Sequence, residues 1–278
     1  GDLITAAAPS PVLGEDIAYT AYLPHGYRRG RGRHPVVYLL HGRGDDMTGW
    51  SRVKPALDRL IADRRVPPLI AVMPDAPYSE AGGYYVDSAF TGTPPGRPVE
   101  SAFTTDLIAH VDGTYRTRTD RASRVVGGYS MGGAGALRYA LAHQDLFAAA
   151  LVLSPAVYTP VPPADSSVRE FGAFGDGERR FAEEVYLAKN YPALLPALDT
   201  ALPLRVYVAV GDDEWPNTDP ADFRHDLDFE AAVVHNHLKR TPAVTTEFRV
   251  FGGGHDWDVW EPAFVDGLPR LLDPPTAT

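Results

Sequence analysis

Ser130 lies between two glycines in the run Gly128-Tyr129-Ser130-Met131-Gly132. This spacing is typical of a nucleophile elbow, in which the chain turns sharply from a strand into a helix and exposes the serine hydroxyl. Side chains larger than glycine at the two flanking positions would collide with neighbouring backbone in such a turn. The run therefore predicts Ser130 as a nucleophile. The alternative interpretation is that Ser130 only caps the helix that follows it.

A histidine late in the chain is the candidate base for this serine. A serine hydroxyl is a weak nucleophile at neutral pH, so it needs a base that removes its proton and an acid that orients the base. His255 follows the last predicted strand directly and is preceded by the glycines at 252–254, which would let the loop bring the imidazole close to Ser130. We therefore predict His255 as the base and the other histidines as structural residues.

Three consecutive carboxylates are candidates for the acid. Asp212, Asp213 and Glu214 follow a predicted strand at 204–210 and the glycine that ends it. One of them is expected to hold the histidine, and at least two are expected to form a solvated turn. An acid that reaches the base usually comes a few residues after such a glycine, which favours Glu214 and then Asp213.

Two backbone amides are candidates for an oxyanion hole. Acyl transfer requires donors aimed at the developing oxyanion, and each contributes roughly 3 to 4 kcal/mol to lowering the barrier. The amide of Met131, directly after the nucleophile, is the first candidate. The loop 41–44 follows a predicted strand at 36–40, and we assign the second donor to the Arg43 amide in this loop. His41 is interpreted as a packed residue that supports the loop.

Aromatic residues near predicted strand ends are candidates for the walls of a substrate pocket. Individually, most aromatic residues belong to a protein core, and a position in a loop after a strand raises the expectation of a binding role. The predicted substrate-binding residues are Trp50, Tyr84, Trp215 and Trp257.

The elements that would position these residues alternate along the chain. Largely apolar runs, which are typical of parallel strands buried on both faces, occupy 36–40, 69–73, 125–127, 149–153 and 204–210, with a further predicted strand at 245–250 and an antiparallel strand at 16–23. Segments with helical periodicity occupy 55–64, 101–115, 134–143 and 223–240. This alternation predicts a doubly wound, mostly parallel sheet with helices on both faces. Ligands bind beyond the carboxyl ends of such strands, which is where the candidate residues lie.

Two long segments break this alternation. Residues 78–99 are rich in glycine, proline and tyrosine, and residues 156–196 are irregular apart from a short helical piece at 181–189. Long irregular segments in a compact domain are usually functional loops or lids. We therefore predict one domain over residues 1–278, with 156–196 as a lid-like insertion.

Composition excludes several classes of function. The 278 residues suffice for one large α/β domain, and no apolar run approaches the roughly 18 residues that span a bilayer. The formal net charge of -10 argues against a nucleic-acid partner. The absence of cysteine excludes thiol catalysis and disulfides, and it is compatible with a secreted or a cytoplasmic location. His225, His235 and His237 lack a metal-binding spacing, so we predict neither a metal site nor a cofactor.

Four motifs, in this order, resemble the esterase D-like branch of the α/β-hydrolases. They are Leu-Leu-His-Gly-Arg-Gly-Asp-Asp-Met-Thr-Gly-Trp at 39–50, Gly-Gly-Tyr-Tyr-Val-Asp-Ser at 82–88, Gly-Tyr-Ser-Met-Gly-Gly at 128–133 and Gly-Gly-His-Asp-Trp at 253–257. The resemblance extends over about 36–260. It implies the α/β-hydrolase fold, a serine nucleophile at Ser130, a base at His255, an Asp or Glu between them, and oxyanion amides at Met131 and Arg43.

Within this branch the sequence favours an esterase of the feruloyl or acetyl-carbohydrate kind. The S-formylglutathione hydrolases typically carry a cysteine near the oxyanion loop, and this chain has none. The antigen 85-type mycolyltransferases share the Gly-Trp ending at 49–50 but usually have aspartate where this chain has His41. Acyl transfer to an acceptor other than water is the first alternative. A catalytically silent hydrolase fold that serves as a binding module is the second. The oligomeric state stays open.

Overall fold

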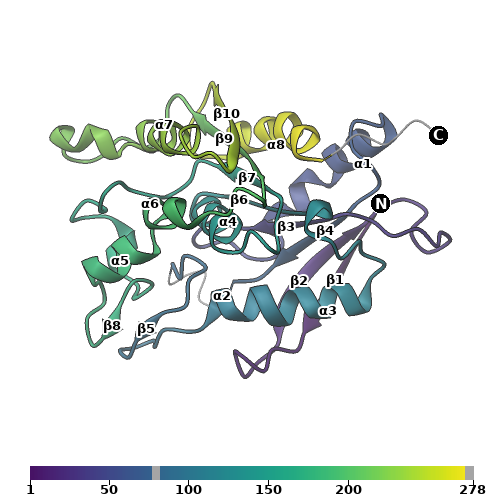
Figure 1. The fold of residues 1–278 in the computed structure, drawn as a ribbon, viewed down its shortest axis with the longest axis horizontal. Helices are drawn as coiled ribbons and strands as arrows, with labels where there is room; N and C mark the ends of the chain where they lie inside the picture. The colour runs from purple at the N-terminus through teal and green to yellow at the C-terminus, as the bar shows by residue number, and fades with distance from the viewer. Residues whose placement is uncertain (77–81, 273–278) are drawn as a thin grey trace.

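The central element of the fold is an eight-stranded sheet. The computed structural model describes residues 1–76 and 82–272, so residues 78–81 of the predicted irregular segment lie outside the described residues. The strand order is β1 (Asp2–Ala8), β2 (Ile17–Leu23), β4 (Ile70–Pro74), β3 (Val36–Leu40), β6 (Arg124–Tyr129), β7 (Ala149–Leu153), β9 (Leu204–Gly211) and β10 (Val244–Phe251). Strands β1 and β2 run antiparallel, and the pairs from β4 to β10 are parallel (Figure 1). The predicted mostly parallel sheet is confirmed.

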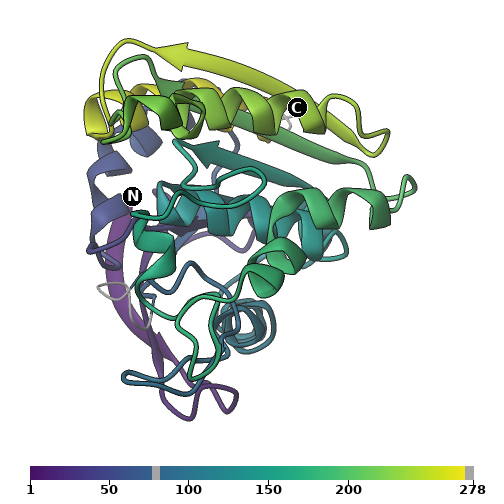
Figure 2. The ribbon, with the colours of Figure 1, turned by 90° about the vertical axis from the view of Figure 1, so that its left-hand side faces the viewer.

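The helices lie between these strands or, for the last helix, after the final strand. They are α1 (Lys54–Ala62), α2 (Val99–Ser101), α3 (Ile108–Thr114), α4 (Met131–Ala142), α5 (Glu183–Lys189), α6 (Tyr191–Leu194), α7 (Leu227–Leu238) and α8 (Trp257–Leu271). A π-helical segment, Ala102–Leu107, joins α2 to α3. A short parallel pair, β5 (Ala89–Phe90) and β8 (Asp176–Gly177), lies apart from the main sheet (Figure 1; the view in Figure 2 is turned by 90°). Within the two described ranges, no helix combines the length and the apolar character that crossing a bilayer requires.

Alternate residues of the central strands enter two separate cores. In β3, Val36, Tyr38 and Leu40 belong to one buried cluster, whereas Val37 and Leu39 belong to the other. This follows from the strand period of two, which sends successive side chains to opposite faces of the sheet. Burial on both faces is the physical reason for the continuous apolar runs in the sequence.

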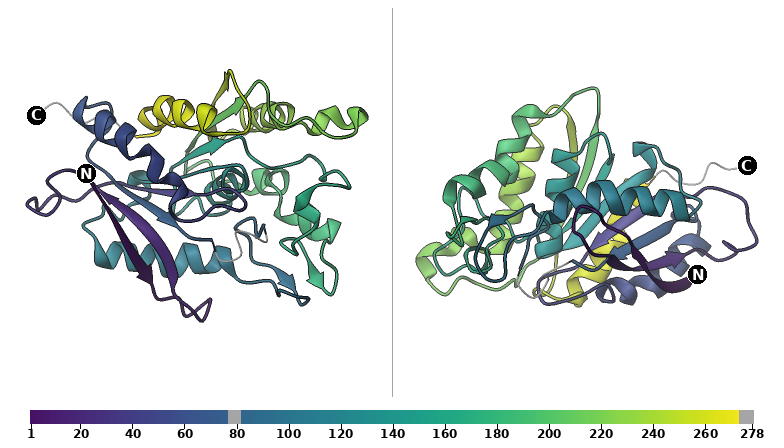
Figure 3. Two further views of the ribbon diagram at one scale, coloured as in Figure 1. Left: turned by 180° about the vertical axis from the view of Figure 1, so that it is seen from behind. Right: turned by 90° about the horizontal axis from the view of Figure 1, so that it is seen from below.

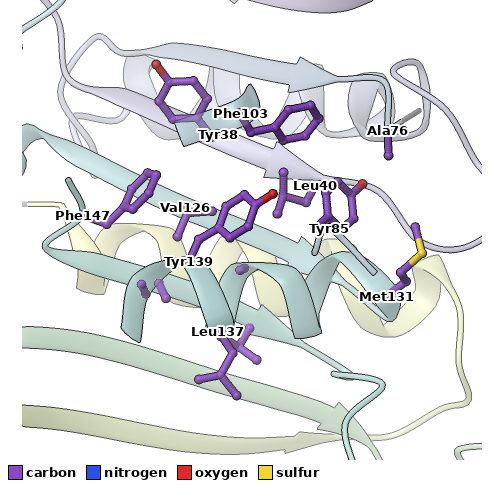
Figure 4. Packing of buried hydrophobic residues seen from close by; sticks show 14 of the residues in the cluster. Tyr38, Leu40, Ala76, Tyr85, Phe103, Val126, Met131, Leu137, Tyr139 and Phe147 are labelled. Atoms are coloured by element: carbon purple, nitrogen blue, oxygen red, sulfur yellow. The ribbon is translucent and has the colours of Figure 1, made fainter. Parts of the chain in front are cut away.

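Helices cover both faces of the sheet. Side chains of α3, α4 and α7 pack in the first cluster, and side chains of α1 and α8 pack in the second. Figure 3 shows helices on both faces of the sheet. Figure 4 shows the first cluster, in which Tyr139 from α4 lies beside Val126 from β6. Because both layers rest on β6, the turn after β6 is held from two sides.

Three elements differ from the sequence-based expectation. Strand β1 was not predicted, because this edge strand is only partly buried and its polar-apolar alternation is weak. Helix α8 was not predicted, because Pro262 and Pro269 lie inside it and proline is a helix breaker in the interior. Burial of Phe264 and Leu268 against the sheet stabilises this helix. Helix α7 begins later than predicted because Asp226 is extended, with φ −63° and ψ 141°.

Candidate active site

Ser130 forms the turn between β6 and α4. Its backbone has φ 55° and ψ −122°, a combination that residues with a Cβ rarely adopt. A Cβ on Gly128 would lie 2.1 Å from the carbonyl oxygen of Gly132, and a Cβ on Gly132 would lie 2.1 Å from the carbonyl oxygen of Leu40. The Ser130 amide donates a 2.9 Å hydrogen bond to the Leu153 carbonyl. The structure thus has the strand, sharp turn and helix of a nucleophile elbow.

Substitution of Gly132 by alanine is expected to destabilise the protein by about 1–3 kcal/mol, the usual effect of overpacking. The added methyl group would meet backbone atoms of Leu40 and His41, which cannot rotate away as a side chain would. Gly113→Ala is the matched control, because a Cβ there has nothing within 4 Å. Denaturant unfolding of both variants measures the difference. Equal stabilities would show that the turn can relax around a Cβ.

Ser130, His255 and Glu214 form one continuous hydrogen-bonded chain. The Ser130 Oγ lies 2.8 Å from His255 Nε2, and His255 Nδ1 lies 2.5 Å from Glu214 Oε2. The side chains of His255 and Glu214 are 3% and 0% exposed. The serine hydroxyl donates to Nε2 while the Nδ1–H donates to the carboxylate, so the imidazole is in the tautomer that can accept the serine proton.

The Glu214 carboxylate has further donors on its other oxygen. Ser154 Oγ donates to Glu214 Oε1 at 2.6 Å, and the Gly211 amide donates to the same oxygen at 2.9 Å. Burial by itself would raise the pKa of the Glu214 carboxyl, but the hydrogen bond and charge of His255, together with these two donors, hold the pKa below its usual value. The carboxylate therefore stays ionised at neutral pH although it is buried.

The two preceding acidic residues are exposed, and both form hydrogen bonds to Gly253. Asp212 Oδ1 accepts a 2.9 Å hydrogen bond from the Gly253 amide, and the Asp213 amide donates a 2.9 Å hydrogen bond to the Gly253 carbonyl. These contacts tie the loop after β9 to the loop after β10. Of the two predicted acids, the structure brings Glu214 to His255 and leaves the Asp213 side chain in solvent.

The loop after β3 passes beside Ser130. A Cβ on Gly42 would lie 3.3 Å from the Ser130 Cβ. His41 is 1% exposed and supports the loop, because its Nδ1 donates to the Gly42 carbonyl at 2.8 Å and its Nε2 accepts from the Ala76 amide at 3.0 Å. Arg43 lines the same cavity as Ser130. Met131 is the first residue of α4, where a backbone N–H has no partner inside the helix.

A cavity of about 520 Å³ opens beside Ser130 and His255. Among the predicted substrate-binding residues, Tyr84 and Trp215 line it. Tyr158 and Ser167, from the predicted lid-like segment 156–196, contribute further walls. The volume lies within the range of small-molecule sites, roughly 300–1,000 Å³.

Trp50 lies in the core and the half-buried Trp257 packs against it, and neither residue lines the cavity. Trp50 is 1% exposed, and its Nε1 donates to the Leu40 carbonyl at 2.9 Å. Trp257 is the first residue of α8, and its ring packs on Trp50 and Tyr129 at centroid distances of 5.4 and 5.0 Å. Both rings point to the α1 and α8 face of the sheet, so the prediction that they line the pocket is corrected. The buried Trp260 lines the cavity.

His225, His235 and His237 contact different partners. His225 Nδ1 lies 2.7 Å from Glu230 Oε1, His235 Nδ1 lies 3.3 Å from Thr246 Oγ1, and His237 Nδ1 lies 2.9 Å from the Tyr191 hydroxyl. Their side chains therefore serve separate structural contacts.

Sequence reasoning missed Ser154 and the bond from Trp260 to it. Ser154 directly follows β7, and its hydroxyl contacts Glu214 and the Trp260 Nε1–H. A polar residue at the carboxyl end of a buried parallel strand was the available signal, because such ends converge on the ligand site.

A family model described as putative esterase matches residues 10–271. The chain belongs to this esterase family. It is 30% identical over 173 residues to an endo-1,4-beta-xylanase/feruloyl esterase of Xylanibacter ruminicola, a match that covers 59% of this chain and 23% of that protein. It is 33% identical over 140 residues to esterase Rv1288 of Mycobacterium tuberculosis, covering 50% of this chain and 29% of that protein. The esterase thus spans less than a third of the length of these curated relatives.

Solved structures place the esterase in the α/β-hydrolase fold. A ferulic acid esterase superposes with a TM-score of 0.75 at 26% identity, over 98% of this chain and 97% of that one. A feruloyl esterase module from Clostridium thermocellum superposes with a TM-score of 0.65 at 18% identity, over 100% and 90% of the two chains, which is a likeness of fold. The predicted membership of the esterase D-like branch is confirmed.

Proposed function

We propose that this chain hydrolyses carboxylic esters through an acyl-enzyme on Ser130. The observation that carries the proposal is the chain of hydrogen bonds from Ser130 through His255 to the buried Glu214, at the wall of a cavity large enough for a substrate. The capping alternative has no support, because the described Ser130 side chain makes no capping hydrogen bond to α4. Its hydroxyl contacts the histidine instead.

Acylation begins when Ser130 Oγ attacks the ester carbonyl carbon and His255 Nε2 takes the hydroxyl proton. The electron pair of the carbonyl moves to its oxygen, and the amides of Met131 and Arg43 would donate to this oxyanion. When the tetrahedral intermediate collapses, the bond to the alcohol oxygen breaks and His255 gives it the proton. Glu214 stays ionised throughout and stabilises the imidazolium.

Deacylation repeats these steps with water. His255 takes a proton from a water molecule as the water oxygen attacks the acyl carbon. The bond to Ser130 Oγ then breaks, and the proton returns from His255 to the serine. The products are a free carboxylic acid and the starting enzyme.

We propose that the substrate is a feruloyl ester or an acetylated carbohydrate, so that the acyl group on Ser130 is feruloyl or acetyl. Two relatives carry feruloyl esterase activity in their names, and one of them resembles the chain over nearly its full length. Tyr84 and Tyr158 line the cavity, and aromatic walls of this kind pack well against an aromatic acyl group. The Tyr84 phenol is protonated at physiological pH even at its ordinary pKa, and burial raises that pKa further, so the hydroxyl is available as a hydrogen-bond donor.

A fluorophosphonate probe combined with an ester panel tests this function. The panel contains methyl ferulate, an acetylated xylo-oligosaccharide and p-nitrophenyl esters of increasing acyl length. We expect stoichiometric labelling of Ser130 and the highest kcat/KM on feruloyl or acetyl esters. Folded protein that neither takes the label nor turns over an ester would indicate a binding module. Transfer of the acyl group to an added sugar in preference to water would indicate an acyltransferase.

A further inference from the structure

Ser154 occupies a strained position directly behind the acid. It is 0% exposed, and its φ of 41° lies in the left-handed region that residues with a Cβ rarely adopt. Its amide donates a 2.7 Å hydrogen bond to the Ala209 carbonyl, which fixes the backbone between β7 and β9. Strained, buried residues of this kind persist where the surrounding structure fixes them, and they gather at functional sites.

Trp260 determines the direction in which the Ser154 hydroxyl points. The Trp260 Nε1–H lies 3.0 Å from Ser154 Oγ, and an indole nitrogen can only donate. The serine oxygen therefore accepts from Trp260, and its own hydrogen is left to donate to Glu214 Oε1 at 2.6 Å. The Trp260 ring is itself held in place, because it stacks on Tyr129 with 4.3 Å between centroids.

The donors around Glu214 are divided between its two oxygens. Oε1 accepts from Ser154 and from the Gly211 amide, whereas Oε2 accepts from His255. Two donors on Oε1 resist rotation of the carboxylate, and the rotation they resist would move Oε2 away from the imidazole. The Trp260 ring also meets the His255 ring edge to face, with 5.1 Å between centroids.

We propose that Ser154, oriented by Trp260, is a positioning residue that holds Glu214 against His255 and thereby aligns the base with Ser130. This assignment rests on the proposed function of the triad. A purely structural role, in which the hydroxyl only satisfies the buried indole N–H, is the competing explanation.

Two substitutions of Ser154 separate the hydroxyl from the backbone strain. Ser154→Ala and Ser154→Gly both remove the hydroxyl, but only glycine adopts a positive φ without a steric cost. We expect both variants to lower kcat about tenfold, the loss typical of a hydrogen bond to a charged group, with KM within twofold of the wild type. Wild-type kcat in either variant, or recovery of kcat in the glycine variant alone, would overturn the proposal.

The titration of the Glu214 carboxyl gives a readout that a purely structural role would not move. The Ser154 hydroxyl is one of the groups that lower the pKa of Glu214, so its removal raises that pKa. Glu214 then becomes protonated at a higher pH in both Ser154 variants, and the resonance of its 13C-labelled carboxyl follows that protonation directly. The other ionisable groups beside Glu214 are the bonded His255 and the exposed Asp212 and Asp213, which the substitution leaves in place. A Glu214 carboxyl that titrates at the same pH in the wild type and in both Ser154 variants would contradict the proposal.

Trp260→Phe tests the orienting contact, because it keeps an aromatic ring and removes the N–H. We expect a lower kcat in the wild-type background and no further loss in the Ser154→Ala background, since the indole would act through the hydroxyl. Additive losses in the double variant would show that Trp260 acts independently of Ser154.

A proton resonance distinguishes failure of this proposal from failure of the proposed function. The His255 Nδ1–H, which donates to Glu214, is expected to resonate far downfield in the wild type and to shift in the Ser154→Ala and Ser154→Gly variants. This signal requires no substrate. If the wild type hydrolyses no ester, the catalytic proposal fails, while a resonance unmoved by either substitution would reject the role of Ser154.

Discussion

Ser130→Ala is expected to lower kcat for a short p-nitrophenyl ester on the order of 10⁴- to 10⁶-fold, the loss typical of removing a catalytic serine. The hydroxyl that His255 contacts at 2.8 Å is the atom that would form the acyl-enzyme, and alanine has no atom to replace it. A small rate above that of water should remain, because the backbone amides of Met131 and Arg43 are unchanged. Initial-rate kinetics, with labelling by a fluorophosphonate, measures both effects.

The fold is expected to tolerate this substitution. Alanine carries a Cβ as serine does, so the strain at φ 55° is unchanged, and the thermal unfolding temperature should stay close to that of the wild type. A Ser130→Ala protein that is folded and retains near-native turnover would remove Ser130 from the mechanism.

Glu214→Gln is expected to lower kcat by about 10⁴-fold, whereas Asp213→Asn should change it less than twofold. The amide of glutamine can present an NH₂ group to His255 Nδ1, which favours the tautomer that cannot accept the proton of Ser130. Both substitutions remove one negative charge from adjacent residues. The comparison therefore separates contact with the imidazole from the general field of the acidic turn.

Steady-state kinetics on one ester, measured for both variants at the same pH, decides between the two carboxylates. Ser154 and Gly211 can still donate to the side-chain oxygen of glutamine, so we expect the variant to fold, as circular dichroism would report. Equal losses in the two variants, or a larger loss in Asp213→Asn, would contradict the assignment of Glu214.

The position of each candidate residue relative to the strands could be predicted from sequence. Ser130, His255 and Glu214 all follow predicted strands, and the carboxyl ends of parallel strands meet at one edge of the sheet. The choice between Glu214 and Asp213 needed the structure. Backbone pairing of Asp213 with Gly253 turns the Asp213 side chain outward, and this pairing connects two loops that are distant in sequence.

The direction of an aromatic side chain was harder to predict than its place in the sequence. Trp50 and Tyr84 both follow strands, yet Trp50 packs against α8 and Tyr84 faces the cavity. The difference depends on which layer of helices lies behind each loop. Helix α8 could not be predicted from sequence because Pro262 and Pro269 lie inside it. The helical layer against which Trp50 and Trp257 pack was therefore not predicted either.

The sheet order has a consequence for how the esterase would lose activity. His255 follows β10, an edge strand that pairs only with β9 in the eight-stranded sheet, whereas Ser130 follows β6 in its interior. Edge elements open at a lower free energy than the interior of a sheet. Partial unfolding of β10 would withdraw the base while the nucleophile elbow stays folded. We therefore expect the esterase to lose activity on heating at a lower temperature than the one at which its core unfolds.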